Sequence, residues 1–273
     1  MVYVLLVFFG VCLGSFVNAL VWRTHKRQAG AKKDRGLSIL NGRSMCPHCR
    51  HELAVKDLIP VISWLALRGR CRYCKKPISI QYPIVEAALG LVFVASYVFW
   101  PVSLHGGQIV LLITWLAASV GLLALLLYDL KWMLLPNPIL YPTLFVAVAG
   151  RLVYLIGYEP DKAHAAAQWI SSVAIAAGIF SLLFYASRGR WIGFGDVRLG
   201  LITGTLLASP AKSFLMLFLA SLLGLAAVMP SMIAGKRHLS GKIPYGPFLI
   251  AAAFICLLFS NGPIDWYKNL VGL

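Results

Sequence analysis

Long apolar runs dominate the chain, and short polar stretches separate them. Most of these runs approach the roughly 20 residues that an α-helix needs to cross a bilayer. The pattern therefore predicts an all-α polytopic membrane protein with about eight transmembrane helices. The expected spans are residues 2–22, 84–100, 108–128, 136–157, 165–187, 193–208, 214–234 and 247–260.

The sixth run, 193–208, is short for a span and is also compatible with a re-entrant segment. Charge favours a full crossing, because basic residues collect on the cytoplasmic side of a membrane. Lys236, Arg237 and Lys242 follow the seventh run, and they face the cytoplasm only if the sixth run crosses. With eight crossings, 21 of the 25 Lys and Arg residues fall on the inner side.

The first run has no basic residue before it, whereas Arg23, Lys26 and Arg27 follow it. A secretory signal peptide carries its positive charges first. We therefore expect an uncleaved helix whose N-terminus is outside and whose C-terminal end is in the cytoplasm.

The net charge of +16 at neutral pH is also a feature of nucleic-acid-binding proteins. Here, however, 14 of the 25 Lys and Arg residues lie between residues 23 and 76, directly after the first run. The positive-inside rule accounts for this asymmetry. We therefore expect no nucleic acid, and anionic lipid headgroups as the partner of the excess charge.

The only sizeable polar segment, 23–82, separates the first helix (1–22) from the remaining membrane domain (83–273). It contains two Cys-x-x-Cys knuckles with 21 residues between the inner cysteines. Four thiolates at such a spacing are typical of a closed, tetrahedral structural zinc site in a small domain. Disulfides or free thiols are the alternative, although a reducing cytoplasm disfavours disulfides. The predicted zinc ligands are Cys46, Cys49, Cys71 and Cys74.

Three of the nine acidic residues lie in or at the end of long apolar runs: Glu86, Asp129 and Asp196. A charged side chain inside a span costs about 2.5–3.5 kcal/mol, so these residues are candidates for function. Counting crossings places Asp129, at the end of the third span, and Asp196, at the start of the sixth, on the same side of the membrane. Glu86 lies in the first turn of the second span, where a carboxylate has a functional role or simply suits the helix dipole.

Two carboxylates in a low-dielectric site cannot both ionise easily, so one keeps a proton. The ionised carboxylate can then act as a general base on water while the protonated one polarises a carbonyl group, as peptide hydrolysis requires. Gly193 and Gly195 precede Asp196 and would let the backbone turn tightly or approach a substrate. Two alternatives remain open: a proton-coupled transporter, and structural ion pairs of the aspartates with Lys131 or Arg198.

Several motifs follow one another along the chain. They are GSFVN at 14–18, the two cysteine knuckles, IPVISWL at 59–65, LRGRC at 67–71, YPIVE at 82–86, Asp129 with Leu135 and Pro136, GFGDVRL at 193–199, and PYGP at 244–247. Together they resemble the type IV prepilin peptidase family, which are GxGD aspartyl proteases of the bacterial inner membrane. The resemblance extends over nearly the full length of the chain.

The resemblance implies an aspartyl endopeptidase that removes the basic leader from type IV prepilin or pseudopilin precursors at the cytoplasmic face, for pilus assembly or protein secretion. It makes Asp129 and Asp196 the catalytic residues of domain 83–273. It also implies N-methylation of the new N-terminus from S-adenosylmethionine, for which the sequence identifies no binding site. Two positions depart from the family pattern: Asn137 stands where aspartate is common, and Arg198 where lysine is usual.

Overall fold

The structure is a computed structural model that describes residues 1–30, 38, 42–233 and 243–271. The chain divides into two compact units, Met1–Val98 and Phe99–Leu273. The described residues of both units form helices and connecting loops, and the extended pairing among them is limited to two isolated β-bridges.

The first unit consists of two long helices and a loop-rich segment between them. Its elements are α1 (Val2–Gln28), η2 (Val55–Asp57), α2 (Ile62–Ala66) and α3 (Gln81–Val98). Glycines allow α1 and α3 to touch backbone to backbone, since a Cβ atom at Gly10 would lie 2.6 Å from the Cα atom of Gly90. Such small-residue contacts are common between helices in membranes. Further along α1, the Asn18 side chain donates to the backbone oxygen of Tyr82 at 3.1 Å and fixes the start of α3.

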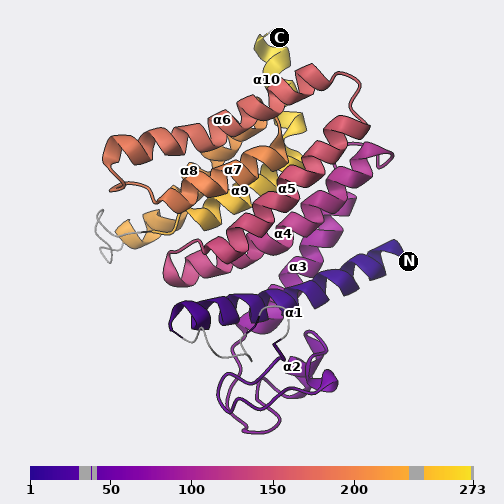
Figure 1. Ribbon diagram of the computed structural model, residues 1–273, viewed down its shortest axis with the longest axis vertical. Helices are drawn as coiled ribbons and strands as arrows, with labels where there is room; N and C mark the ends of the chain where they lie inside the picture. The colour runs from indigo at the N-terminus through magenta and orange to yellow at the C-terminus, as the bar shows by residue number, and fades with distance from the viewer. Residues whose placement is uncertain (31–37, 39–41, 234–242, 272–273) are drawn as a thin grey trace. The chain divides into compact units, whose positions relative to one another are not determined.

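The second unit is a bundle of six apolar helices followed by a terminal helix (Figure 1). These are α4 (Gly107–Trp132), α5 (Asn137–Gly157), α6 (Lys162–Ser187), α7 (Phe194–Leu207), α8 (Pro210–Ile233), α9 (Gly246–Phe259) and α10 (Asn261–Val271). α7 is central, because it contacts α5, α6, α8 and α9. Its closest neighbour is α6, where a Cβ atom at Gly200 would lie 2.6 Å from the carbonyl oxygen of Ala176.

Every apolar run predicted from the sequence forms a helix, so the all-α polytopic prediction is confirmed. Six helices are long and apolar enough to cross a membrane: α1, α3, α4, α5, α6 and, over Pro210–Pro230, α8. α7 and α9 have 14 residues each and are shorter. Crossing by these two helices, the outside N-terminus and the division at residues 22 and 82 stay predictions. Lys236, Arg237 and Lys242, on which the orientation argument rests, lie outside the described residues.

Candidate active site

Asp129 lies in the last turn of α4 and is buried, with 5% of the residue exposed. Its Oδ2 atom accepts a hydrogen bond of 3.1 Å from the backbone N–H of Gly246, which is 117 positions later and opens α9. The helix ends a few residues further on, because Met133 takes a left-handed conformation and its N–H donates to the Asp129 carbonyl oxygen at 2.8 Å. The carboxyl group is thus held against the start of α9.

The space beside this contact holds no Cβ atom at position 246 unless the carboxyl group moves. A Cβ atom there would lie 2.6 Å from Oδ2 of Asp129 and 3.6 Å from Cδ2 of Leu199 in α7. The first distance is shorter than real Cβ contacts, so a larger residue would force the carboxyl group to move. Gly246 therefore marks the point where α4, α7 and α9 converge. Sequence reasoning assigned Gly246 no role, although proline and glycine directly before an apolar run are a signal for a helix start.

Asp196 lies in the first turn of α7, close to this point. Its N–H donates at 3.1 Å to the carbonyl oxygen of Gly193, the residue that caps the helix. The residue is only partly exposed, and its carboxylate interacts electrostatically with Asp129. Since α4 and α7 both contact α9, two aspartates from separate helices reach one site. The structure thus brings together the two carboxylates that the sequence pattern paired.

The two glycines before Asp196 differ in what they require. Gly193 has φ −76° and ψ 148°, an extended conformation that any residue adopts, so its backbone needs no glycine. Gly195 is packed against the α4–α5 loop, where a Cβ atom would lie 3.1 Å from Cδ1 of Leu135. The absence of a side chain at Gly195 lets Leu135 approach the first turn of α7.

The neighbouring basic residues point to other partners. The Nζ atom of Lys131 lies 5.6 Å from the centre of the Trp132 ring, and the guanidinium carbon of Arg198 lies 5.0 Å from the centre of the Phe194 ring. Among the described residues, the ion pairs are Arg43–Glu52 and Arg72–Asp57. Neither aspartate of the site takes part in one. The geometry therefore gives no support to helix-end ion pairs.

Glu86 belongs to the first unit, where it is buried in α3 with 6% of the residue exposed. Its Oε2 atom accepts a hydrogen bond of 2.6 Å from the N–H of Val61, and the Ser15 hydroxyl of α1 also contacts the carboxylate. Glu86 thus connects α3 to both α1 and the loop before α2. Both readings of Glu86 from the sequence, a functional role and a favourable interaction with the helix dipole, stay predictions.

The four knuckle cysteines form one cluster in the first unit. All four sulfur atoms lie within 4.8 Å of one another, and Sγ of Cys46 is 3.9 Å from Sγ of Cys74. Four thiolates about 2.3 Å from one tetrahedral zinc ion would lie about 3.8 Å apart. The four cysteines are free thiols, so they form no disulfide. Their geometry fits a single tetrahedral metal ion.

Both knuckles share one backbone conformation. In the first, the N–H of Cys46 donates to the oxygen of His51 at 3.0 Å, and the N–H of Arg50 donates to the oxygen of Cys46 at 3.0 Å. The residues 25 positions later make the same two hydrogen bonds, at 2.9 and 3.0 Å. One isolated β-bridge closes each hairpin, and in the first knuckle it joins Met45 to Glu52. The equivalent knuckles present two pairs of thiolates, as a structural zinc site requires.

Two family models match the chain. One describes the bacterial peptidase A24 N-terminal domain and covers residues 8–100, and the other describes the type IV leader peptidase family and covers residues 116–229. A protein of Aeromonas hydrophila named prepilin leader peptidase/N-methyltransferase is 31% identical over 97% of this chain and 93% of its own length. The chain belongs to the type IV leader peptidase family.

Family members with the same name occur in distant bacteria. The Pseudomonas aeruginosa protein is 30% identical over 96% of this chain and 92% of its own length. The Bacillus subtilis protein is 28% identical over 97% of this chain and 98% of its own length. No solved structure matches the chain. The expected family is thus confirmed, and the transporter alternative finds no support.

The two departures from the family pattern contact each other. Nη1 of Arg198, on α7, donates a hydrogen bond to Oδ1 of Asn137, the first residue of α5. An amide oxygen is therefore the acceptor for this basic side chain, and the hydrogen bond links the start of α5 to α7.

Proposed function

We propose that this protein is an aspartyl endopeptidase that removes the basic leader from type IV prepilin or pseudopilin precursors at the cytoplasmic face of the bacterial inner membrane. We propose further that it methylates the new N-terminus. The family and the names of the relatives support both activities. The observation that carries the peptidase is the convergence of Asp129 and Asp196 from separate helices on the start of α9.

The two aspartates have distinct roles in this proposal. Oδ2 of Asp129 accepts the Gly246 N–H, and a hydrogen-bond donor of this kind stabilises an ionised carboxylate. Asp129 is therefore the general base, which takes a proton from water as the water oxygen attacks the scissile carbonyl carbon. Asp196 carries the proton that stabilises the carbonyl oxygen. Collapse of the tetrahedral intermediate then breaks the C–N bond, and the leaving amine takes up a proton.

The location suits such a substrate. A prepilin-like precursor has a basic leader in the cytoplasm and an apolar helix in the membrane, so its scissile bond lies at the inner interface. Both aspartates lie at the ends of apolar helices, at the end of α4 and the start of α7. With eight crossings and an outside N-terminus, these two ends belong to the cytoplasmic leaflet.

The remaining features complete the proposal. We propose that Cys46, Cys49, Cys71 and Cys74 hold one structural zinc ion, which would replace the apolar core that a short segment lacks. The ion would have no open coordination position and no part in hydrolysis. Anionic lipid headgroups are the proposed partner of the basic residues between 23 and 76.

Substitution of each aspartate tests the peptidase. Asp129→Asn and Asp196→Asn keep the side-chain volume but remove the carboxylate, so each is expected to abolish leader removal from a purified prepilin precursor. Asp265→Asn, on the exposed surface of α10, is the matched control and is expected to cleave normally. All variants are expected to insert and accumulate like the parent protein. Full cleavage by either of the first two variants would refute the assignment, whereas reduced yield with normal specific activity would indicate a structural role.

A further inference from the structure

The second unit contains a cavity at the opposite end of its helices from the two aspartates. Gln108, at the start of α4, lines this cavity, whereas Asp129 lies in the last turn of the same helix. At about 1.5 Å per residue, these two positions are about 30 Å apart along the helix axis. α7 runs the other way, since Asp196 lies in its first turn and Leu207, its last residue, lines the cavity.

The cavity has room for a small polar group. It encloses about 620 Å³ with its open mouth counted, but the centre of a water molecule can reach only about 130 Å³ of it. On this measure a single water molecule needs about 10–15 Å³. A group of a few non-hydrogen atoms, such as a phosphate with its nearest waters, therefore fits, whereas a whole nucleotide does not.

Two cationic side chains, Arg151 of α5 and Lys212 of α8, line the cavity, and no acidic side chain does. The Nε atom of Arg151 is shielded from solvent and has no hydrogen-bond partner among the described residues. Two carboxylates outside the wall, Glu159 and Asp265, interact electrostatically with these cations but form no ion pair with them in the described part of the chain. Because a buried charge without a close partner is costly, the cavity favours an anionic group.

Neutral hydrogen-bond donors complete the wall. The indole N–H of Trp100 donates to Oε1 of Gln108 at 3.2 Å, which leaves the amide nitrogen of Gln108 as a donor. Thr205 also lines the cavity and is 3% exposed, and its hydroxyl group makes no hydrogen bond with the residues that the structure describes. Cations and neutral donors together match the oxygen atoms of a phosphate group.

The rest of the wall favours a phosphate that belongs to a lipid. Trp100 and Trp115 line the cavity, and tryptophan concentrates where a membrane meets water. Leu206, Leu207 and Leu257 provide apolar surface beside the cations. Basic pockets between transmembrane helices bind phospholipid headgroups elsewhere. A phosphate joined to acyl chains uses both the cations and the apolar wall.

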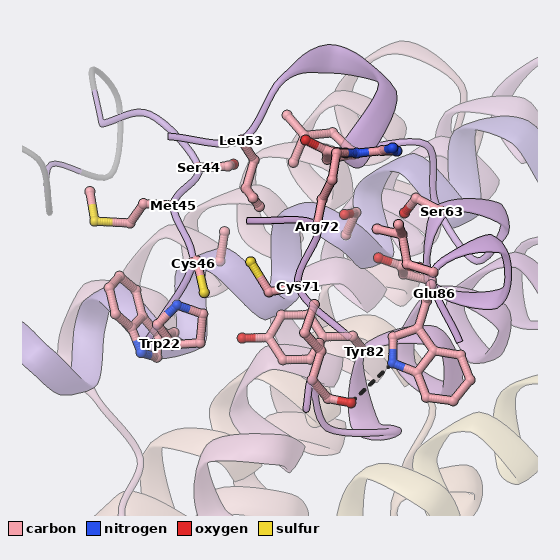
Figure 2. A pocket seen from close by; sticks show the side chains of 18 of the residues that line it. Trp22, Ser44, Met45, Cys46, Leu53, Ser63, Cys71, Arg72, Tyr82 and Glu86 are labelled. Carbon is pink, nitrogen blue, oxygen red and sulfur yellow. Dashed lines mark hydrogen bonds and ion pairs between the residues drawn. The ribbon is translucent and has the colours of Figure 1, made fainter. Parts of the chain in front are cut away.

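The cavity of the first unit, between α1, α3 and the cysteine knuckles, has the opposite character (Figure 2). Its Arg72 is paired with Asp57 at 2.6 Å, and Glu86 adds a second carboxylate to the wall. An anion would be repelled by these carboxylates. Of these two cavities, only the one in the second unit therefore suits a phosphate.

We propose that the cavity of the second unit binds the phosphate group of an anionic phospholipid, at the face of the membrane opposite the two aspartates. The planar guanidinium of Arg151 is the donor for two phosphate oxygens, and Lys212 supplies a second positive charge. This site is separate from the basic residues between 23 and 76. It depends on neither the peptidase nor the methyltransferase activity.

Native mass spectrometry of the purified full-length protein, titrated with phosphatidylglycerol or phosphatidylcholine in detergent, tests the proposal. Phosphatidylglycerol is expected to bind with a dissociation constant at least tenfold lower, because the choline cation of the other lipid meets two positive charges. Arg151→Gln and Lys212→Gln are each expected to weaken binding about tenfold, as loss of one charge-assisted hydrogen bond does. Lys162→Gln, on the exposed surface at the start of α6, makes the same change of charge and is expected to bind like the parent protein. Asp129→Asn is also expected to bind normally.

Two measurements separate a lost site from a misfolded variant. Thermal unfolding checks that each variant is folded, and Arg151→Lys, which keeps the charge, is expected to bind more tightly than Arg151→Gln. On the parent protein, a phosphatidylglycerol analogue with a photoreactive headgroup is expected to label peptides that contain residues 100–115 or 205–212. Excess phosphatidylglycerol is expected to prevent this labelling, and inorganic phosphate is not.

Three results would overturn the proposal. Displacement of the analogue by inorganic phosphate would assign the cavity to a free anion instead of a lipid. Label confined to other peptides would place the lipid elsewhere, for example on the basic segment 23–76. Unchanged binding of phosphatidylglycerol by both Arg151→Gln and Lys212→Gln would show that the two cations hold no phosphate.

Discussion

The substitution Gly246→Ala tests whether the start of α9 positions the catalytic carboxyl group. The added Cβ atom would lie 2.6 Å from Oδ2 of Asp129, whereas ordinary contacts begin at 3.4 Å, so the two atoms must separate by 0.8 Å. A displacement of about 1 Å in a catalytic group can cost about 100-fold in rate. Loss of the N–H hydrogen bond to a charged group, worth about 1.5–3 kcal/mol, corresponds to about 10- to 150-fold. We therefore expect kcat/KM for leader cleavage to fall by about 100-fold.

The assay follows cleavage of a purified prepilin precursor by mass spectrometry, with the enzyme in excess so that single-turnover rates report the chemical step. Gly178→Ala is the matched control, because no atom lies within 4 Å of the added Cβ on α6. Gly121→Ala creates a clash elsewhere, 1.9 Å from Oγ1 of Thr143, and is expected to lower thermal stability. If Gly246→Ala cleaves within threefold of the parent rate, Asp129 does not depend on this contact and the argument fails.

Two further predictions concern the first unit. Metal analysis of the purified protein is expected to give about one zinc per chain, and Cys46→Ser is expected to lose it. A folded protein that contains no metal would contradict the proposed zinc site. Burial acts to raise the pKa of Asp57, but hydrogen bonds from Arg72 and Tyr73 outweigh it and hold the pKa below its usual value. This contribution to stability is therefore complete above the unfolded pKa of about 3.9 and is lost as pH falls through the folded pKa. Asp57→Asn is expected to lower the free energy of unfolding by about 1 kcal/mol at pH 7 and by much less at pH 3. Limited proteolysis at the two pH values measures this loss, and equal losses at both would contradict the prediction.

The elements of this fold are predictable because they depend on local patterns. Each apolar run forms a helix close to its expected limits, for example α6 at Lys162–Ser187 against an expected span of 165–187. The cysteine cluster is predictable for a similar reason, since two knuckles of fixed spacing present their thiolates locally. The pairing of Asp129 with Asp196 follows from counting crossings, which fixes the side of the membrane but no distance.

The contacts that complete the sites were not predictable, because they join residues far apart in the chain. Gly246 donates to a carboxyl group 117 positions away, and Val61 donates to Glu86 from a loop 25 positions away. Helical periodicity carries no information on either contact. The contact between Asn137 and Arg198 was likewise not predictable, because the two residues are 61 positions apart in the chain.

The two helices that are too short for an ordinary span are also the two that begin at the site. α7 starts two residues before Asp196, and α9 starts at Gly246. Fourteen residues extend about 21 Å, against a hydrocarbon thickness of about 30 Å. The first turn of a helix leaves its N–H groups without intrahelical partners, and such groups are tolerated at membrane depth only inside protein or beside water. Hydrolysis needs water and an extended substrate backbone at this depth, and longer helices would fill the space that both must occupy.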